Sequence, residues 1–175
     1  MTAGVDAQYA LMKREMDASF SWTDLESLRQ AWPHTLLVKG ILRPDDAERA
    51  VAAGADGIVV SNHGGRQLDS SLAPLDILPA IARRVNVPII VDSGFRRGSD
   101  VVKALALGAS AVILGRAPLY GLASAGKQGV SRCIQIFQNE IDTTMALIGA
   151  RSINDIDPSL VALPPRYYPE PSREF

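Results

Sequence analysis

Four short apolar runs alternate along the chain with longer amphipathic stretches. Each run is almost continuously hydrophobic and rich in β-branched residues, which is typical of parallel strands that are buried on both faces. We expect these strands at residues 35–40, 57–62, 87–94 and 111–116. The regular alternation of strand and helix predicts an α/β fold built on a parallel sheet.

The stretches between the runs place Leu, Ala, Val and Ile at helical spacing. We expect helices at residues 21–32, 43–55, 70–86, 98–109 and 129–148. The first of these helices opens with an S-x-x-D capping box from Ser21 to Asp24. The last one is followed by Gly149, which is a suitable C-cap because glycine adopts the left-handed conformation without strain.

The number of strands limits the architecture. A strand about every 20 to 30 residues, with "GAD" and "GAS" in equivalent places before the second and fourth strands, indicates successive similar units. A complete (β/α)8 barrel has eight strands and typically about 250 residues. We therefore predict an α/β fold with about four βα units, half of a TIM (β/α)8 barrel. Within it we expect a leader at 1–20, the half-barrel at 21–150 and a proline-rich irregular tail at 151–175.

Composition adds few constraints. The chain has 175 residues, 47% of them hydrophobic, and a net charge of −1, which is ordinary for one globular domain and does not indicate a nucleic-acid partner. Its single cysteine, Cys133, excludes an intramolecular disulfide, fits a reducing compartment and is expected to be a small core residue of the last helix. No apolar run reaches the roughly 20 residues of a membrane-spanning helix, so we expect a cytoplasmic protein.

Polar, basic and glycine residues collect directly after the four expected strands. In barrel folds the carboxyl ends of the strands carry the chemistry. The residues collected there are Lys39, Ser61, His63, Arg66, Asp92, Ser93, Gly94, Arg96, Gly115 and Arg116. Because one end of the sheet gathers a lysine, a histidine and several arginines, it favours an anionic ligand.

The clearest part of this site is a candidate phosphate end. Backbone amides at Gly94, Gly98 and Gly115 can approach a phosphate closely, helped by the N-terminus of the helix expected to begin near Ser99. Arg96 or Arg116 can add charge-assisted hydrogen bonds. The alternative is that these glycines are helix caps and these arginines are solvated.

The motifs "LLVKG", "SNHGGRQLD", "DSGFRRGSDVVKALALGA" and "VILGRAPLYGLA", in this order, resemble the C-terminal half of the FMN-dependent 2-hydroxy acid dehydrogenases and oxidases. The resemblance runs from about residue 16 to Gly149 and is nearest the (S)-mandelate and L-lactate dehydrogenase branch. It implies FMN as the cofactor and oxidation of a small (S)-2-hydroxy acid to a 2-oxo acid. A quinone, a cytochrome or oxygen would be the electron acceptor.

The resemblance also implies roles for individual residues. Lys39 would lie at the pyrimidine end of the flavin and stabilise negative charge there. His63 would be the base that takes a proton from the substrate, and Arg66 would bind the substrate carboxylate as a planar two-pronged donor. The remaining flavin and phosphate contacts implied by the family are Ser61, Asp92, Ser93, Gly94, Phe95, Arg96, Gly115 and Arg116.

Other residues near these motifs are expected to be structural. His34 matches no motif of the family, and Asp69 is expected to brace the loop that carries His63. The family's first four strands, with the aspartate that pairs with the catalytic histidine, a substrate-binding tyrosine and a second substrate arginine, have no counterpart in the chain. At most the trailing residues of the family's membrane-contacting insertion would lie in residues 1–13.

We therefore expect activity to need a complementary N-terminal half, with a homo-oligomer as the other possible assembly. Three alternatives stay open from the sequence. The chain is a non-enzymatic half-barrel that binds phosphate or FMN, a truncated gene remnant, or a relative of inosine-monophosphate dehydrogenase. The last group needs a loop cysteine, and Cys133 lies elsewhere. The substrate side chain and the electron acceptor are not specified by the sequence.

Overall fold

The sheet has the four parallel strands that the apolar runs predict. In a computed structural model that describes residues 4, 7 and 17–162, the strands pair in the order β1-β2-β3-β4. Their bounds are β1 Leu37–Ile41, β2 Gly57–Val60, β3 Ile89–Val91 and β4 Ala111–Val112. The last two are shorter than expected because residues after Val91 and Val112 turn away from the sheet to form the loops of the candidate site.

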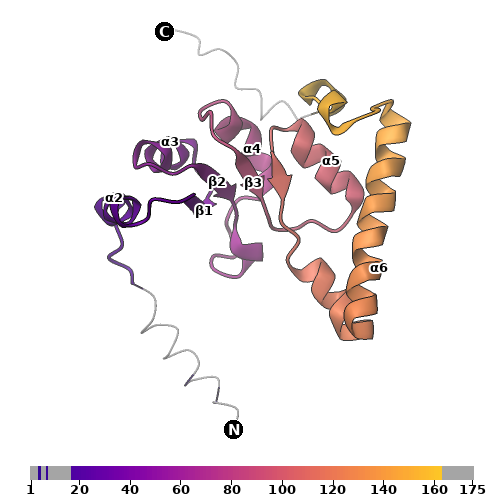
Figure 1. Cartoon of the computed structure of the whole chain (residues 1–175), viewed down its shortest axis with the longest axis horizontal. Coiled ribbons are helices and arrows are strands. Elements are labelled where there is room, and N and C mark those ends of the chain that lie inside the picture. Colours follow the sequence, from indigo (N-terminus) through magenta and orange to yellow (C-terminus); the bar gives the residue numbers. More distant parts are fainter. Residues whose placement is uncertain (1–3, 5–6, 8–16, 163–175) are drawn as a thin grey trace.

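Helices follow the strands in regular alternation (Figure 1). Their bounds are α2 Trp22–Ala31, α3 Pro44–Ala52, α4 Pro74–Ala82, α5 Gly98–Ala106 and α6 Arg116–Ile148. The capping box from Ser21 to Asp24 and the left-handed C-cap at Gly149, with a φ of 77°, are confirmed. α3 and α4 both begin with proline. Proline lacks an N–H group, but this costs nothing in the first turn, where an N–H group has no acceptor within the helix.

The helix after β4 begins 13 residues earlier than the expected start at residue 129. α6 starts at Arg116, immediately after the last strand, and bends sharply at Ala125 and Gly126, where the helical backbone angles are interrupted. Gly121 and Gly129 touch across this bend, since a Cβ on either glycine would overlap the backbone of the other. The small residues of this segment allow the close crossing of two helical segments.

The main core lies between the sheet and helices α3, α4 and α5. Ile58, Val60 and Val91 of the strands pack there with Leu78 and Ile81 of α4, all of them fully buried. Burying a side chain of this size stabilises the fold by about 1.5 to 3 kcal/mol. Because side chains alternate along a strand, Lys39 and Leu37 face away from this core. Leu37 of β1 and Ile113, directly after β4, remain 44% and 42% exposed.

Part of the expected irregular tail is ordered against the domain. Two short 3₁₀ turns, Ile153–Asp155 and Pro158–Leu160, follow α6, and Val161 packs against the core. Residues 163–175 of the tail, and all of the expected leader except residues 4, 7 and 17–20, lie outside the described residues. None of the helices in the described ranges combines the length and apolar character that crossing a membrane requires.

Candidate active site

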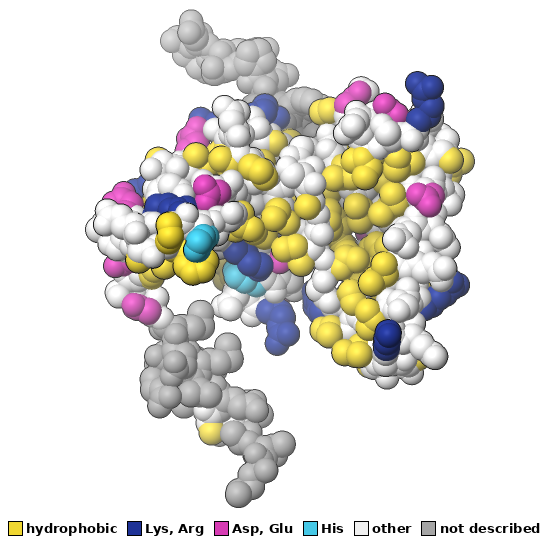
Figure 2. Space-filling view, viewed as in Figure 1, with side chains coloured by type: hydrophobic (Ala, Val, Ile, Leu, Met, Phe, Trp, Pro, Cys, Tyr) yellow, Lys and Arg dark blue, Asp and Glu magenta, His cyan; other side chains and the backbone are white. Residues whose placement is uncertain are grey.

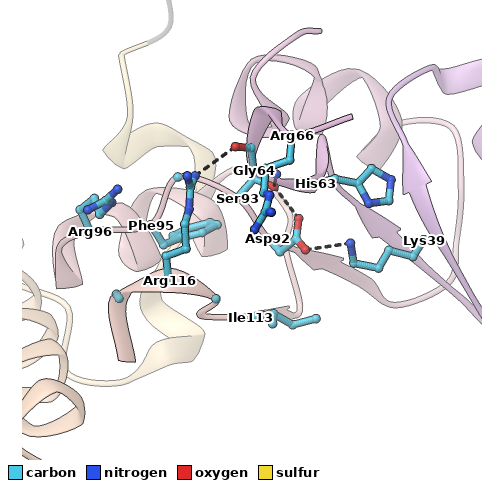
Figure 3. A pocket seen from close by; sticks show the side chains of 13 residues that line it. Lys39, His63, Gly64, Arg66, Asp92, Ser93, Phe95, Arg96, Ile113 and Arg116 are labelled. Carbon is cyan, nitrogen blue, oxygen red and sulfur yellow. Dashed lines mark hydrogen bonds and ion pairs between the residues drawn. The ribbon is translucent and has the colours of Figure 1, made fainter. Parts of the chain in front are cut away.

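A cavity of about 220 Å³ lies at the carboxyl ends of the strands and is lined by residues from all four of them (Figure 3). β1 contributes Lys39, the first turn of α6 contributes Arg116 and Ala117, and the segments after β2, β3 and β4 contribute the rest. Every predicted site residue lines this cavity except two. Ser61 is fully buried and hydrogen-bonded to Lys39, and Gly98 lies at the start of α5. The complete lining is Lys39, His63, Gly64, Arg66, Asp92, Ser93, Gly94, Phe95, Arg96, Ile113, Gly115, Arg116 and Ala117.

The Lys39 ammonium is held in place by its neighbours. Its Nζ lies 3.1 Å from Oδ2 of Asp92 and donates to Oγ of Ser61 at 3.0 Å. The hydroxyl of Ser93 donates to the other carboxylate oxygen of Asp92 at 2.7 Å. Burial raises the pKa of Asp92, but hydrogen bonds from Ser61, Ser93 and Lys39, and the charge of Lys39, outweigh burial and lower that pKa below its usual value.

This network predicts a pH-dependent contribution to stability. Because the pKa of Asp92 is lowered in the folded chain, its ionised form stabilises the fold above the unfolded pKa of about 4. This contribution is lost as the pH falls through the folded pKa. We expect Asp92→Asn to have a lower free energy of unfolding than wild type at pH 7, as measured by urea unfolding. At pH 3 the free energies of unfolding of variant and wild type should differ less. The matched control is Asp69→Asn, which alters an exposed carboxylate. An equal difference at both pH values would contradict the assignment.

The loop that carries His63 is fixed by hydrogen bonds to its backbone. The Oδ1 of Asn62 accepts from the N–H groups of Gly64 and Gly65 at 3.0 and 3.2 Å. Ser93 Oγ also accepts from Gly64 N–H, at 3.0 Å, and Arg116 donates to the Gly64 carbonyl at 3.0 Å. The loop is therefore attached to the segments after β3 and β4, and not only to its own strand.

His63 itself adopts an unusual backbone conformation. Its φ is 54°, in the left-handed region that non-glycine residues rarely enter, and its N–H donates to Ser61 Oγ at 3.0 Å. Such strain at a cavity is often functional. The side chain is exposed, and within residues 17–162 no aspartate or glutamate forms an ion pair with it.

Gly40 makes room for the imidazole of His63. It lies in β1 where the register with β2 shifts, and its φ is 95°. A Cβ at this position would lie 3.0 Å from Nε2 of His63. A side chain here would therefore be both strained and in the place of the imidazole. The motifs did not mark Gly40 as a site residue. The signal that could have found it is a glycine placed directly after the lysine at the end of a strand.

The candidate phosphate end is formed by two glycine loops. A Cβ on Gly94 or Gly115 would meet no atom within 4 Å, so the backbone at both positions opens onto the cavity. Gly115 is the N-cap of α6, whose first N–H groups have no partner within the helix and favour an anion. Arg116 already donates to Gly64, and the Arg96 guanidinium lies 5.3 Å from the ring centre of Tyr120.

The expected phosphate role of Gly98 is wrong. Its N–H donates to Oε2 of Glu140 on α6 at 2.7 Å, and the N–H groups of Arg96 and Arg97 both donate to Asp100 at 3.0 Å. The N-terminus of α5 is thus capped by carboxylates of the chain itself. Gly98 is buried where α5 meets α6, and this close packing explains the glycine.

Three other predicted roles can be compared with the structure. Cys133 lies in α6 as expected, but it is only partly buried and lines a second cavity instead of the core. His34 is exposed, and its ring packs edge-on against Trp32 at 5.1 Å, in agreement with a structural role. Asp69 was expected to brace the loop that carries His63, but it is exposed. The hydrogen bonds described above, which fix that loop, come from other residues.

Comparison with known proteins identifies the family. A profile for FMN-dependent dehydrogenases matches residues 2–163. The chain belongs to this family. It is 53% identical to (S)-mandelate dehydrogenase of Pseudomonas putida over 157 residues, which cover 90% of the chain and 40% of that enzyme. It is also 48% identical to an L-lactate oxidase of Nostoc sp., covering 91% of the chain and 44% of the oxidase.

Solved structures agree with the family assignment. A crystal structure of (S)-mandelate dehydrogenase, described as a monotopic membrane protein, matches 92% of the chain with a TM-score of 0.85 and 52% sequence identity. The match covers 43% of that enzyme, so the chain spans about two-fifths of the length of its relatives. These neighbours are TIM barrels, and the chain corresponds to their C-terminal part, which confirms the predicted fold class and family.

FMN is the cofactor of this family, as the motifs implied. The chemistry of the cavity fits FMN, because exposed glycine backbone and a helix N-terminus suit a phosphate. The ammonium of Lys39 at the other side of the cavity suits the negative charge of a reduced flavin.

Proposed function

We propose that the chain is the FMN-binding and proton-accepting half of a 2-hydroxy acid dehydrogenase or oxidase. The reaction is oxidation of an (S)-2-hydroxy acid of the mandelate or lactate type to a 2-oxo acid. One observation carries the proposal. Lys39 of β1 and the residues His63 and Arg66 of the loop after β2 line a single cavity with the glycine loops at Gly94 and Gly115.

The chain's residues divide between cofactor and substrate. When bound, FMN supplies an acceptor for two electrons. Gly94, Gly115 and the cations Arg96 and Arg116 would hold its phosphate, and Lys39 its pyrimidine end. Ser61, Asp92, Ser93 and Phe95 complete the cofactor set. The contacts that Ser61, Asp92 and Ser93 form with Lys39 and with one another support this role, because they fix the Lys39 ammonium.

His63 and Arg66 act on the substrate in this proposal. Arg66 binds the carboxylate through two parallel hydrogen bonds and so orients the carbon that is oxidised. The imidazole of His63 accepts the proton, either from that carbon or from the hydroxyl group, since both routes need one base. The position of its ring against Gly40 favours a fixed orientation.

The proposed enzyme is larger than the chain, which spans about two-fifths of its relatives. A complementary N-terminal half would complete the barrel and supply the carboxylate that stabilises the His63 imidazolium. A homo-oligomer is the other assembly that we propose. We propose the same domain division as above, with the half-barrel at 21–150. The electron acceptor in this proposal is a quinone, a cytochrome or oxygen, because the relatives include both a dehydrogenase and an oxidase.

We also propose a cytoplasmic location, peripheral at the inner face of the membrane, because one similar enzyme is described as a monotopic membrane protein.

The first test is a titration of the chain with FMN, following flavin fluorescence, with circular dichroism as a check on folding. We expect saturable quenching by FMN and binding of riboflavin, which lacks the phosphate, that is at least about tenfold weaker. Equal affinities would contradict the phosphate assignment. A chain completed with the N-terminal half should then bleach bound flavin with (S)-mandelate or L-lactate, but not with (R)-mandelate.

A non-enzymatic FMN-binding half-barrel is the second candidate. It is supported by the phosphate end, which the chain forms from its own residues. Selective binding of FMN without bleaching by any 2-hydroxy acid in the completed barrel would favour this candidate over the enzyme.

A further inference from the structure

A second cavity, of about 720 Å³, lies in the bend of α6, and we call it the α6 groove. Its volume is within the range of about 300 to 1,000 Å³ that small-molecule sites occupy. Both segments of α6 form its walls, and Arg96 of the loop after β3 closes one side. The lining residues are Arg96, Ala117, Tyr120, Gly121, Ser124, Ala125, Gln128, Gly129, Arg132, Cys133, Ile136 and Phe137.

The groove combines an apolar body with positive charge. Tyr120 and Ile136, which are 56% and 41% exposed, supply most of the large apolar surface, and the almost fully buried Phe137 adds to it. Figure 2 shows how widely apolar side chains extend over the region of α6. Two arginines, Arg96 and Arg132, line the groove, and no aspartate or glutamate is among its lining residues. An apolar surface with only positive charge is complementary to an amphipathic anion.

The walls of the groove are fixed by contacts within the chain. The bend at Gly126 and the contact between Gly121 and Gly129 set the angle of the two α6 segments. Beside the groove, α6 is attached to α5 by the hydrogen bond from Gly98 to Glu140 and by the Arg97–Glu140 ion pair at 2.9 Å. A preformed groove of this kind loses little entropy on binding a ligand.

We propose that the α6 groove binds a free alkyl carboxylate, with Arg132 engaging the carboxylate and the alkyl chain lying against Tyr120, Ile136 and Phe137. This groove adjoins the proposed FMN site, because Arg96 and Ala117 line both cavities, but neither of the proposed substrate residues His63 and Arg66 lines it. The Arg96 guanidinium already lies over Tyr120, on the groove side. Charge complementarity favours a carboxylate over a neutral lipid or a second copy of the chain.

Cys133 provides a site-specific readout, because it lines the groove and is the chain's single cysteine. We would measure its alkylation by neutral N-ethylmaleimide, without FMN, at increasing concentrations of decanoate below its micellar range. Saturable slowing by decanoate is expected, with little slowing by acetate or 1-decanol. Arg132→Gln should raise the half-maximal decanoate concentration about tenfold or more, since a charge-assisted hydrogen bond is lost. Lys127→Gln, an exposed position of α6 outside the groove, should leave it unchanged.

Several results would overturn the proposal. These are no slowing by decanoate, equal slowing by 1-decanol, or an unchanged response in Arg132→Gln with native circular dichroism. If alkylation of Cys133 became slower as the protein concentration rose, without decanoate, a second copy of the chain would be the occupant of the groove. Faster alkylation after removal of residues 163–175 would identify the chain's own tail. Because FMN is absent throughout, these outcomes are independent of the proposed enzyme activity.

Discussion

Replacement of His63 by alanine is expected to slow flavin reduction by (S)-mandelate roughly 10²- to 10⁴-fold in the completed barrel, the range that a general base contributes. FMN affinity should change little, since the glycine loops and Lys39 that would hold the cofactor keep their own contacts. Stopped-flow bleaching of the flavin measures the first quantity, and a fluorescence titration measures the second.

The control for this experiment is His34→Ala, because His34 is the chain's only other histidine and lies outside the cavity. It should leave both rate and affinity unchanged. Rapid flavin reduction by the His63 variant would remove His63 from the mechanism. Loss of FMN binding in the same variant would show instead that the loop after β2 helps to hold the cofactor cavity.

Replacement of Gly98 by alanine is expected to lower the free energy of unfolding by about 1 to 3 kcal/mol, the usual cost of overpacking a tight contact. The new Cβ would lie 2.5 Å from Ile141 N and 2.6 Å from the Cβ of Glu140. Separation of α5 from α6 would also weaken the hydrogen bond from Gly98 N–H to Glu140. Urea unfolding followed by circular dichroism measures the loss.

Gly115→Ala is the matched control, since a Cβ there meets open space and the φ of Gly115 is −94°. We expect its stability to stay within about 0.5 kcal/mol of wild type. Its FMN affinity should fall, because the added methyl group enters the candidate phosphate end. If Gly98→Ala weakened FMN binding without loss of stability, the phosphate role rejected for Gly98 would have to be restored.

The sequence by itself determined the elements and the end of the sheet where the polar residues lie. Strands of continuous apolar residues, the capping box at Ser21 and the glycine at 149 are local signals, because hydrophobic spacing and backbone preferences act over a few residues. Parallel strands bring their carboxyl ends to one edge. The grouping of the residues after β1, β2, β3 and β4 into one site therefore follows from the order of the elements along the chain.

Only the tertiary structure decided which partners those residues have. The attachment of Gly64 to Ser93 and Arg116, the ion pair of Lys39 with Asp92, and the use of Gly98 in helix packing all join segments far apart in the chain. A sequence shows that an amide, a cation or a glycine is present. The packing of helices and loops over the sheet decides which partner each of these groups contacts. The same packing decides whether the group stays free to bind a ligand.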